Sequence, residues 1–236
     1  MSRSIAVIGA RGFVGAAICK EINGRPDCEL ITIHRSDDIP SLISKAEVVI
    51  HVANPSKRFF AQNNPQSDFV ESVEKTFTIK HLVKDKKFIL ISSISARVQQ
   101  DTVYGRNRRA CELIVDDGRS LIVRLGPMYG EGKLVGAFYD LLENNPVYVS
   151  EETQYALVDV AYNARKIVDF IDCVGLIEIG ARDSIRLGKL KTILGSSSSF
   201  SGHDDTQTPI DPPPDAPGVR DAIDYALSLK EQIKNK

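Results

Sequence analysis

A chain of 236 residues, 42% of them hydrophobic and 26% charged, is long enough to bury the core of one large domain. Its formal net charge of −1 excludes a general attraction to nucleic acid or to an anionic membrane. No apolar run approaches the roughly 18 residues of a membrane-spanning helix, and no basic and apolar leader precedes the first apolar run. The composition therefore predicts a cytoplasmic protein that binds neither nucleic acid nor membrane.

The cysteines and histidines, four of each, are scattered along the chain, and no two cysteines form a CxxC pair. Dispersed thiols of this kind are typical of reduced intracellular proteins. Zinc sites need ligands at short and regular spacing, which these residues lack. We therefore expect no metal site.

The first half of the chain alternates short apolar runs with segments of helical spacing. The runs are Ile5–Ile8, Leu30–Ile33, Val48–Val52, Phe88–Ile91 and Leu121–Leu125. Continuous apolar runs are typical of strands that are buried on both faces of a parallel sheet. Helical spacing is clear at Val14, Ala17, Ile18 and Ile22, and looser at Val70, Val73, Phe77 and Leu82. This alternation predicts an α/β fold, a Rossmann-like doubly wound parallel sheet, over residues 1–125.

The pattern loosens beyond residue 125 and predicts a small C-terminal substrate lobe over residues 126–236. Its strand-like stretches are "PVYVS", "YALVDV" and "LIEIGA", and Ala161–Ile171 has the pattern of a helix. The serine- and proline-rich stretch 196–218 predicts a long, exposed and flexible loop, because proline cannot donate to a sheet or sit inside a helix. A closing amphipathic helix is predicted by Val219, Ile223, Ala226, Leu227 and Ile233.

The stretch "AVIGARGFVGAAI" contains three glycines between the first apolar run and a helix that starts near Phe13. In such a turn Gly9 permits the sharp bend, Gly12 lets the backbone approach a phosphate, and Gly15 lets the helix pack on the strand. Backbone N–H groups at the start of the helix would then bind a diphosphate. The stretch thus predicts a nucleotide-binding turn rather than a plain loop, with contacts from Gly9, Arg11, Gly12, Phe13, Val14 and Gly15.

The residue that follows the second predicted strand bears on the choice of nucleotide. About 20 residues past the glycines, a chain that binds NAD usually offers an acidic residue to the adenosine ribose 2′-hydroxyl. Arg35 stands there instead, and a guanidinium suits the 2′-phosphate of NADP. Arg11 would reach the same phosphate, so NADP is favoured over NAD. The alternative is that both arginines are solvated and that Asp37 or Asp38 contacts a ribose.

Two further stretches carry residues suited to chemistry. "ILISSIS" places Ser92 and Ser93 at the end of a buried strand, where open α/β sheets bind ligands. "VYGRNRRACELIV" places Tyr104 and Arg108 four residues apart, on one face of a predicted helix. The inward residues of this helix are expected to be Cys111, Leu113 and Ile114.

The ordered set "GARGFVG", "VVIHVAN", "ILISS", "YGRNRR", "VRLGPMYG" and "ALVDVAYNA" extends over residues 4–170. In this order the motifs resemble the extended or atypical branch of the short-chain dehydrogenase/reductase superfamily. That branch contains NAD(P)-dependent nucleotide-sugar epimerases, dehydratases and reductases. The GxRGxxG form, together with the arginine after the second strand, looks most like members that use NADP.

The resemblance implies a role for each matching residue. Tyr104 would be the general acid/base, and Ser93, with Ser92 as its alternative, would hydrogen-bond the substrate oxygen. Arg108 stands where the family usually has lysine, and a cation beside a tyrosine favours the phenolate, whose ordinary pKa is about 10. Tyr104 and Arg108 would also contact the cofactor. Ala53 would line it, and the turn that contains Pro127 would lie near the nicotinamide.

The function implied by the resemblance is an NADP-dependent oxidoreductase or epimerase that acts by hydride transfer on a sugar, with a nucleotide-linked sugar favoured. Epimerase, dehydratase and reductase are not separated by these residues. The alternative is an NADP(H)-binding redox-sensing or scaffold protein with little or no catalysis. Family members often dimerise through two helices, which here implies a homodimer built on Tyr104–Val115 and Val70–Val83.

Overall fold

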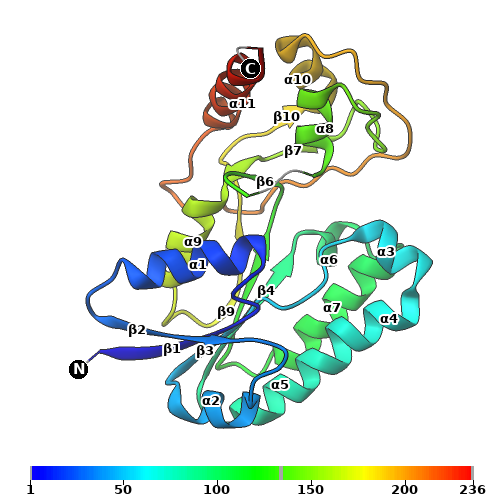
Figure 1. The fold of residues 1–236 in the computed structure, drawn as a ribbon. Helices are drawn as coiled ribbons and strands as arrows, with labels where there is room; N and C mark the ends of the chain where they lie inside the picture. Colours follow the sequence, from blue (N-terminus) through cyan, green and yellow to red (C-terminus); the bar gives the residue numbers. More distant parts are fainter. Residues whose placement is uncertain (1, 133–134, 235–236) are drawn as a thin grey trace. The chain divides into compact units, whose positions relative to one another are not determined.

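The structure is a computed structural model that describes residues 2–132 and 135–234. It consists of two compact units, shown in Figure 1. The first unit contains Met1–Leu125 and Ala161–Ile177, and the second contains Gly126–Val160 and Glu178–Lys236. The first segment of the first unit ends at Leu125. The segment 161–177, expected in the C-terminal lobe, instead returns to the first unit, where it supplies a helix and most of a strand.

The first unit is built on a six-stranded sheet with the order β2-β1-β3-β4-β5-β9. Its strands are β1 (Arg3–Ile8), β2 (Cys28–Ile33), β3 (Val48–His51), β4 (Lys87–Ser93), β5 (Leu121–Leu125) and β9 (Gly175–Ile179). The pairs from β2 through β5 are parallel. Strand β9 runs in the same direction as β5. The Gly175 backbone N–H donates to the Ser120 carbonyl, and the Gly126 N–H donates to the Ile179 carbonyl. The predicted α/β fold with a parallel sheet is confirmed, and all five runs predicted in the first half are strands.

The strand order explains where a ligand site would lie. It is the doubly wound order 2-1-3-4-5 with one further strand, β9, beside β5. Residues 34–47 form only the short helix α2 (Ile39–Lys45), so β2 is an edge strand. The order in which strands are added to the sheet reverses between β1 and β3. Open sheets bind ligands outside the carboxyl ends of the strands at this switch point.

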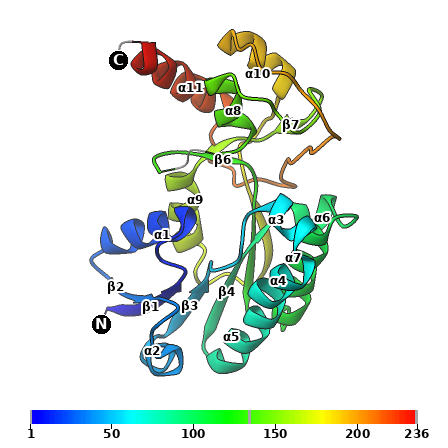
Figure 2. The ribbon, with the colours of Figure 1, turned by 45° about the vertical axis from the view of Figure 1, so that its right-hand side comes forward.

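Helices cover both faces of this sheet. They are α1 (Phe13–Asn23), α3 (Arg58–Asn63), α4 (Pro65–Phe69), the π-helical turn η1 (Val70–Glu74), α5 (Lys75–Val83), α6 (Ser95–Val98), α7 (Val103–Val115) and α9 (Val160–Asp169). Helices α1 and α9 lie together on one face, and α4, α5 and α7 lie on the other (Figures 1 and 2). The Arg25 guanidinium donates to Asp169 at 2.6 Å and joins α1 to α9. Within the described ranges, no helix has the length and apolar character needed to cross a membrane.

In its described residues, the second unit combines short strands with helices. Strand β6 (Met128–Tyr129) pairs in parallel with β8 (Val158–Asp159), and β7 (Gln154–Tyr155) pairs antiparallel with β10 (Ile185–Arg186). The helices are α8 (Ala137–Glu143), α10 (Leu187–Leu194) and α11 (Val219–Lys234). Helix α11 confirms the predicted closing helix, because Val219, Ile223 and Ala226 are buried. The side chain of Ile233 lies outside the described residues.

Two of the strand-like stretches of the second unit differ from the prediction. "PVYVS" is not a strand: Val147 makes an isolated bridge to Phe200, and Tyr148 is exposed. Pro146 cannot donate a backbone hydrogen bond, so the stretch cannot extend a ladder in that direction. "YALVDV" contributes to two short strands, β7 and β8, instead of one continuous strand.

Residues 196–218, all of them described, form no helix or strand, but they are only partly exposed. Ser198, Asp205 and Gln207 are buried. The Tyr155 hydroxyl donates to the Asp205 carboxylate at 2.5 Å, and the Gln207 backbone N–H donates to the Gln154 carbonyl at 2.9 Å. These contacts attach the middle of the loop to β7.

Replacing Tyr155 with phenylalanine tests this attachment. A hydrogen bond to a charged group contributes about 1.5–3 kcal/mol, so its loss should raise local opening of the loop roughly tenfold or more. Limited proteolysis with mass spectrometry should therefore show faster cleavage within 196–218. Ser201→Ala, at an exposed position of the same loop, is the control and should be cleaved like the wild type. Equal cleavage of both variants would contradict the attachment.

Candidate functional site

The glycine turn after β1 brings three backbone segments into close contact. Gly9 has φ +100°, and a Cβ at this position would lie 2.8 Å from the backbone nitrogen of Ala53. A Cβ on Gly15 would lie 2.1 Å from the Gly9 carbonyl oxygen. Gly12 begins α1 as its N-cap and is exposed, with that oxygen 3.4 Å from its Cβ position. The turn therefore leaves the start of α1 open to an anion, as phosphate-binding turns do.

The other predicted contacts surround this turn in the first unit. Ala53 packs on Gly9, Phe13 and Val14 are half-buried, and Arg11 is exposed. The Gly9 backbone N–H donates to the Ile33 carbonyl at 3.4 Å, which holds the end of β2 against the turn. Arg35, two residues farther along the chain, therefore lies at the rim of the same turn.

Ser93 and Ser92 end β4 but have different surroundings. The Ser92 hydroxyl is buried and donates to the Glu112 carboxylate at 2.7 Å. The Ser93 hydroxyl is half-buried and lies 3.2 Å from both the hydroxyl and the backbone nitrogen of Ser95. Ser92 is thus part of the packing between sheet and helix, and Ser93 is the serine that opens toward the carboxyl edge of the sheet.

Tyr104 and Arg108 lie on successive turns of α7 and are both buried. The guanidinium carbon of Arg108 is 4.8 Å from the centre of the Tyr104 ring and lies over its face. Its Nη2 donates to the Pro55 carbonyl. Its Nε is buried and makes no hydrogen bond within residues 2–132 and 135–234. A buried unpaired donor at the edge of the sheet indicates a position where a ligand would complete the bonding.

The inward face of α7 differs from the prediction at one position. Cys111 is fully buried as expected, but Leu113 is 61% exposed, so its predicted inward placement is wrong. Glu112 is buried instead, because it continues the stripe of Tyr104 and Arg108 at intervals of four residues. The Arg124 guanidinium on β5 compensates the negative charge of Glu112 by donating two hydrogen bonds of 2.8 and 2.6 Å to its carboxylate.

Glu112 therefore connects the helix that carries Tyr104 to two neighbouring strands, through Ser92 on β4 and Arg124 on β5. The first turn of α7 is fixed in addition by Gly105. A Cβ at this glycine would lie 2.0 Å from the Gln99 carbonyl oxygen, so only glycine allows the close packing against the end of α6. Sequence reasoning missed Glu112 and Arg124. Their signal was a charged residue on the Tyr104–Arg108 stripe and an arginine inside the apolar run of β5.

His51 ends β3 behind the site and is fully buried. Its Nε2 is 3.2 Å from the Thr76 hydroxyl. Burial, and then the nearby positive charges of Lys75 and Arg108, lower the pKa of His51 from 6.5 to about 3. His51 is therefore neutral at physiological pH. Among the described residues, no group of three or more histidine, cysteine, aspartate or glutamate side chains could hold a metal ion.

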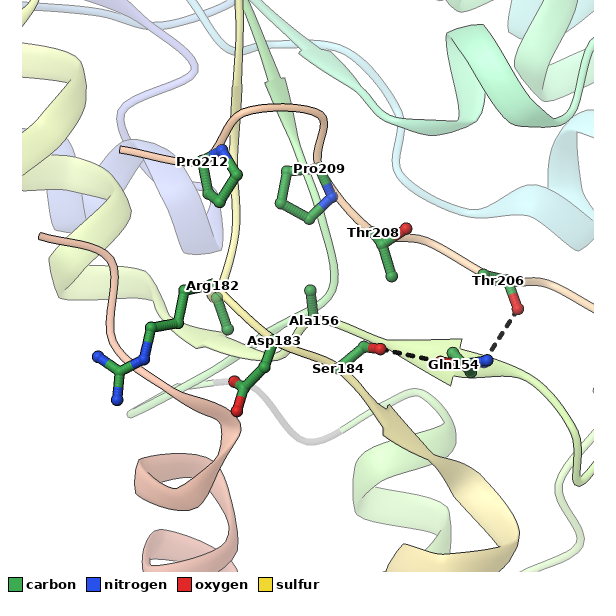
Figure 3. Close-up of a pocket in the computed structure, with 10 residues that line it drawn as sticks. Gln154, Ala156, Arg182, Asp183, Ser184, Thr206, Thr208, Pro209 and Pro212 are labelled. Atoms are coloured by element: carbon green, nitrogen blue, oxygen red, sulfur yellow. Dashed lines mark hydrogen bonds between the residues drawn. The ribbon is translucent and has the colours of Figure 1, made fainter. Parts of the chain in front are cut away.

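The second unit contains an open pocket of about 340 Å³, shown in Figure 3. Its polar wall includes Gln154 and Ser184, whose hydroxyl donates to the Gln154 side chain at 2.9 Å. Arg182 and Asp183 lie beside them and also bind backbone atoms near the start of α11. The volume is within the range of small-molecule sites.

Pro127, predicted to lie near the nicotinamide, belongs to the second unit, and its carbonyl accepts a hydrogen bond from the Val158 backbone N–H at 3.2 Å.

The Glu112–Arg124 pair gives a stability prediction. Glu112→Ala leaves the Arg124 guanidinium buried without its carboxylate, which should lower the free energy of unfolding by about 3–5 kcal/mol in urea denaturation. Arg109→Ala is the matched control, because Arg109 pairs with the same carboxylate at 3.1 Å but is 39% exposed. Its loss should cost at most about 1 kcal/mol. Similar losses for the two variants would overturn the role given to Arg124.

His51 gives a prediction for the pH dependence of stability. Between the ordinary pKa of 6.5 and the folded value of about 3, the unfolded chain binds a proton that the folded chain does not. Stability should therefore fall as the pH falls through this interval, by up to about 1.4 kcal/mol per pH unit from this group. His51→Asn should show a shallower dependence in urea denaturation across the interval. His203→Asn, at an exposed histidine, should keep the wild-type slope. A wild-type slope in His51→Asn would contradict the assignment.

The chain has only weak sequence similarity to known proteins. No protein-family model matches the chain. The UDP-2-acetamido-2,6-beta-L-arabino-hexul-4-ose reductase of Pseudomonas aeruginosa is 25% identical over 113 residues. The match covers 46% of this chain and 29% of the reductase, so the chain spans less than a third of that relative's length.

Solved structures are similar over nearly the whole chain. The UDP-glucuronic acid 4-epimerase of Bacillus cereus, in complex with UDP-glucuronic acid and NAD, has a TM-score of 0.77 at 17% identity, covering 96% of this chain and 99% of its own. The NAD-dependent NDP-hexosamine 5,6-dehydratase TunA reaches 0.80 at 14% identity, covering 98% of both chains. The dTDP-4-dehydrorhamnose reductase of Yersinia enterocolitica reaches 0.74 at 16% identity, covering 96% of this chain and 99% of its own.

At identities this low, the structural similarity establishes the fold but not the activity. At the level of the fold, the resemblance expected from the ordered motifs is confirmed. The chain has a Rossmann-like fold, and its structural neighbours include nucleotide-sugar epimerases, dehydratases and reductases.

Proposed function

We propose that the chain is a nicotinamide-dinucleotide-dependent oxidoreductase or epimerase that acts on a sugar in nucleotide-linked form. One observation carries the proposal. The open glycine turn and the residues Ser93, Tyr104 and Arg108 lie in the same unit, at the carboxyl ends of parallel strands. In doubly wound folds this edge binds the dinucleotide and the reacting group together.

The residues at the turn fit such a cofactor. Gly12 offers an exposed backbone approach at the start of α1, and Ala53 packs against Gly9 on the adjoining strand end. The buried Nε of Arg108 supplies an unpaired donor. When bound, the nicotinamide supplies the hydride acceptor and donor. The preference for NADP rests on Arg11 and Arg35 alone; the neighbours from Bacillus cereus were solved with NAD, and the pairing of Arg35 described below argues for NAD.

The side chains of the first unit provide the proton transfer. Tyr104, as its phenolate, would accept the proton of a sugar hydroxyl as the carbinol carbon loses hydride to the nicotinamide, and as the phenol it would return the proton in the reverse step. The Ser93 hydroxyl would donate a hydrogen bond to the same sugar oxygen and hold it in place. Arg108, which lies over the Tyr104 ring, would fix the ring and add positive charge beside it.

The homodimer expected from the resemblance is part of this proposal. Large apolar side chains are exposed on the helices that were expected to form it: Phe69, Val70 and Phe77 along α4, η1 and α5, and Leu113 on α7. Exposed apolar residues gathered on neighbouring helices are typical of protein interfaces.

A second candidate is a protein that binds the dinucleotide with little or no catalysis, in a redox-sensing or scaffold role. The position of Arg108 favours it. The guanidinium stacks on the ring and donates to the Pro55 carbonyl, whereas a lysine ammonium would offer a compact charge able to reach the phenol oxygen.

Binding and turnover separate the two candidates. We expect calorimetric titration with NADH and NADPH to detect binding, and UDP- and dTDP-linked sugars to give turnover. Tyr104→Phe should retain cofactor binding and lose turnover by roughly 10² to 10⁴-fold, because it lacks the proton-transfer group. Tyr148→Phe, at an exposed ring of the second unit, is the control and should be as active as the wild type.

Three other outcomes would change the assignment of function. Cofactor binding without turnover of any nucleotide sugar supports the second candidate. Turnover that survives in Tyr104→Phe removes Tyr104 from the mechanism. Absence of binding by the folded protein overturns both candidates, because both depend on the glycine turn.

A further inference from the structure

Three charged side chains form a continuous chain of ion pairs at the rim of the glycine turn. The Arg35 guanidinium after β2 pairs with one carboxylate oxygen of Glu71 on η1. The Lys75 ammonium at the start of α5 pairs with the other. The sequence predicted Arg35 as a cofactor contact but gave no partner for it. Glu71 and Lys75 had only the weak signal of opposite charges four residues apart on a helix.

Hydrogen bonds connect this ion-pair chain to the turn at both ends. The Gly9 N–H donates to the Ile33 carbonyl, so β2 ends beside the turn two residues before Arg35. The Lys75 ammonium donates to the carbonyl of Ala53 at 3.5 Å, and Ala53 is the residue on which Gly9 packs. Glu71 therefore bridges the ends of β2 and β3. A dinucleotide bound at such a turn places its adenosine ribose at the end of the second strand.

The side chain of Glu71 is less exposed than that of its partner Arg35, and its position is therefore better defined. The Arg35 side chain is 79% exposed, whereas that of Glu71 is 34% exposed and that of Lys75 27%. The hydrogen bond from Lys75 lowers the pKa of Glu71, and the pairing with Arg35 lowers it further. Burial raises this pKa, but by less than the hydrogen bond from Lys75 lowers it. Glu71 is therefore a carboxylate at neutral pH. It lies in a π-helical turn, a local form that is frequent at functional sites.

We infer that Glu71 determines whether the site accepts NAD or NADP, and that it selects NAD. The inference rests on the proposed function, because it requires a nicotinamide dinucleotide at the turn. A 2′-phosphate would have to displace Glu71 from Arg35 and lie beside its negative charge. A ribose 2′-hydroxyl can instead donate to the carboxylate, which thus replaces the acidic residue that NAD-binding chains usually carry after the second strand.

The charges at the rim give the direction of the test. Arg35 and Lys75 contribute two positive charges and Glu71 one negative charge, so the three residues have a net charge of +1. Glu71→Gln preserves the shape of the side chain and raises the net charge to +2. It also releases Arg35 to bind a phosphate with its planar set of donors.

The experiment is calorimetric titration of the full chain with NADH and with NADPH. The wild type should bind NADH more tightly. In Glu71→Gln the ratio of the two dissociation constants should shift toward NADPH by roughly tenfold or more, because a hydrogen bond to a charged group is gained and a repulsion is lost. Glu74→Gln is the matched control, since it removes the same charge from an exposed position in the same turn. It should leave the ratio unchanged.

A second variant keeps the inference testable if Glu71→Gln folds poorly. Arg35→Ala alters an exposed side chain, and it should weaken NADPH binding while NADH binding stays close to that of the wild type. The inference is overturned by tighter NADPH binding in the wild type, by an unchanged ratio in folded Glu71→Gln, by an equal shift in Glu74→Gln, or by equal losses of both cofactors in Arg35→Ala. Folded proteins that bind neither cofactor would instead show that the proposed function fails.

Discussion

The geometry of the candidate site depends on one buried carboxylate, that of Glu112. Arg124 and Ser92 bind it from two adjacent strands, so α7 is held against the sheet by charge-assisted hydrogen bonds as well as by apolar packing. A buried carboxylate is costly unless it is paired, and the position of its partner is therefore specific. Because Tyr104 and Arg108 lie on the same stripe of α7, the pair that satisfies Glu112 also sets the rotation of the helix that carries them.

The carboxyl ends of β2 and β3 show a related use of charge. Arg35, Lys75 and Arg108 bring three positive charges to this edge, and Glu71 returns one negative charge. A protonated His51 would add another positive charge within a fully buried setting, and both burial and the neighbouring cations oppose that protonation. A neutral His51 thus leaves the positive charges of Lys75 and Arg108 near the site without placing a charged histidine in the core.

The sequence predicted the sheet well because its strands are buried on both faces, and continuous apolar runs are the signal that such strands leave. It predicted the glycine turn because close backbone contacts, such as that of Gly9 with Ala53, admit no other residue type. It failed where partners are distant in the chain. An apolar side chain such as Leu113 predicts an inward position, whereas Glu112 is the buried residue because its partner Arg124 lies on another element. In the same way, the pairing of Arg35 with Glu71 depends on the fold that brings β2 beside η1.

Arg108 shows what a single change of residue type does to such a site. A lysine carries a compact charge at the end of a flexible chain, whereas the planar guanidinium both stacks and donates. Here it lies over the face of Tyr104 and binds the Pro55 carbonyl, which connects α7 to the segment after β3. One nitrogen, Nε, stays buried without a hydrogen bond in the described chain. Arg108 is thus placed to hold the ring of Tyr104, and its unpaired Nε can donate a hydrogen bond to a bound ligand. Positioning of the phenol and attraction of the ligand then come from one side chain.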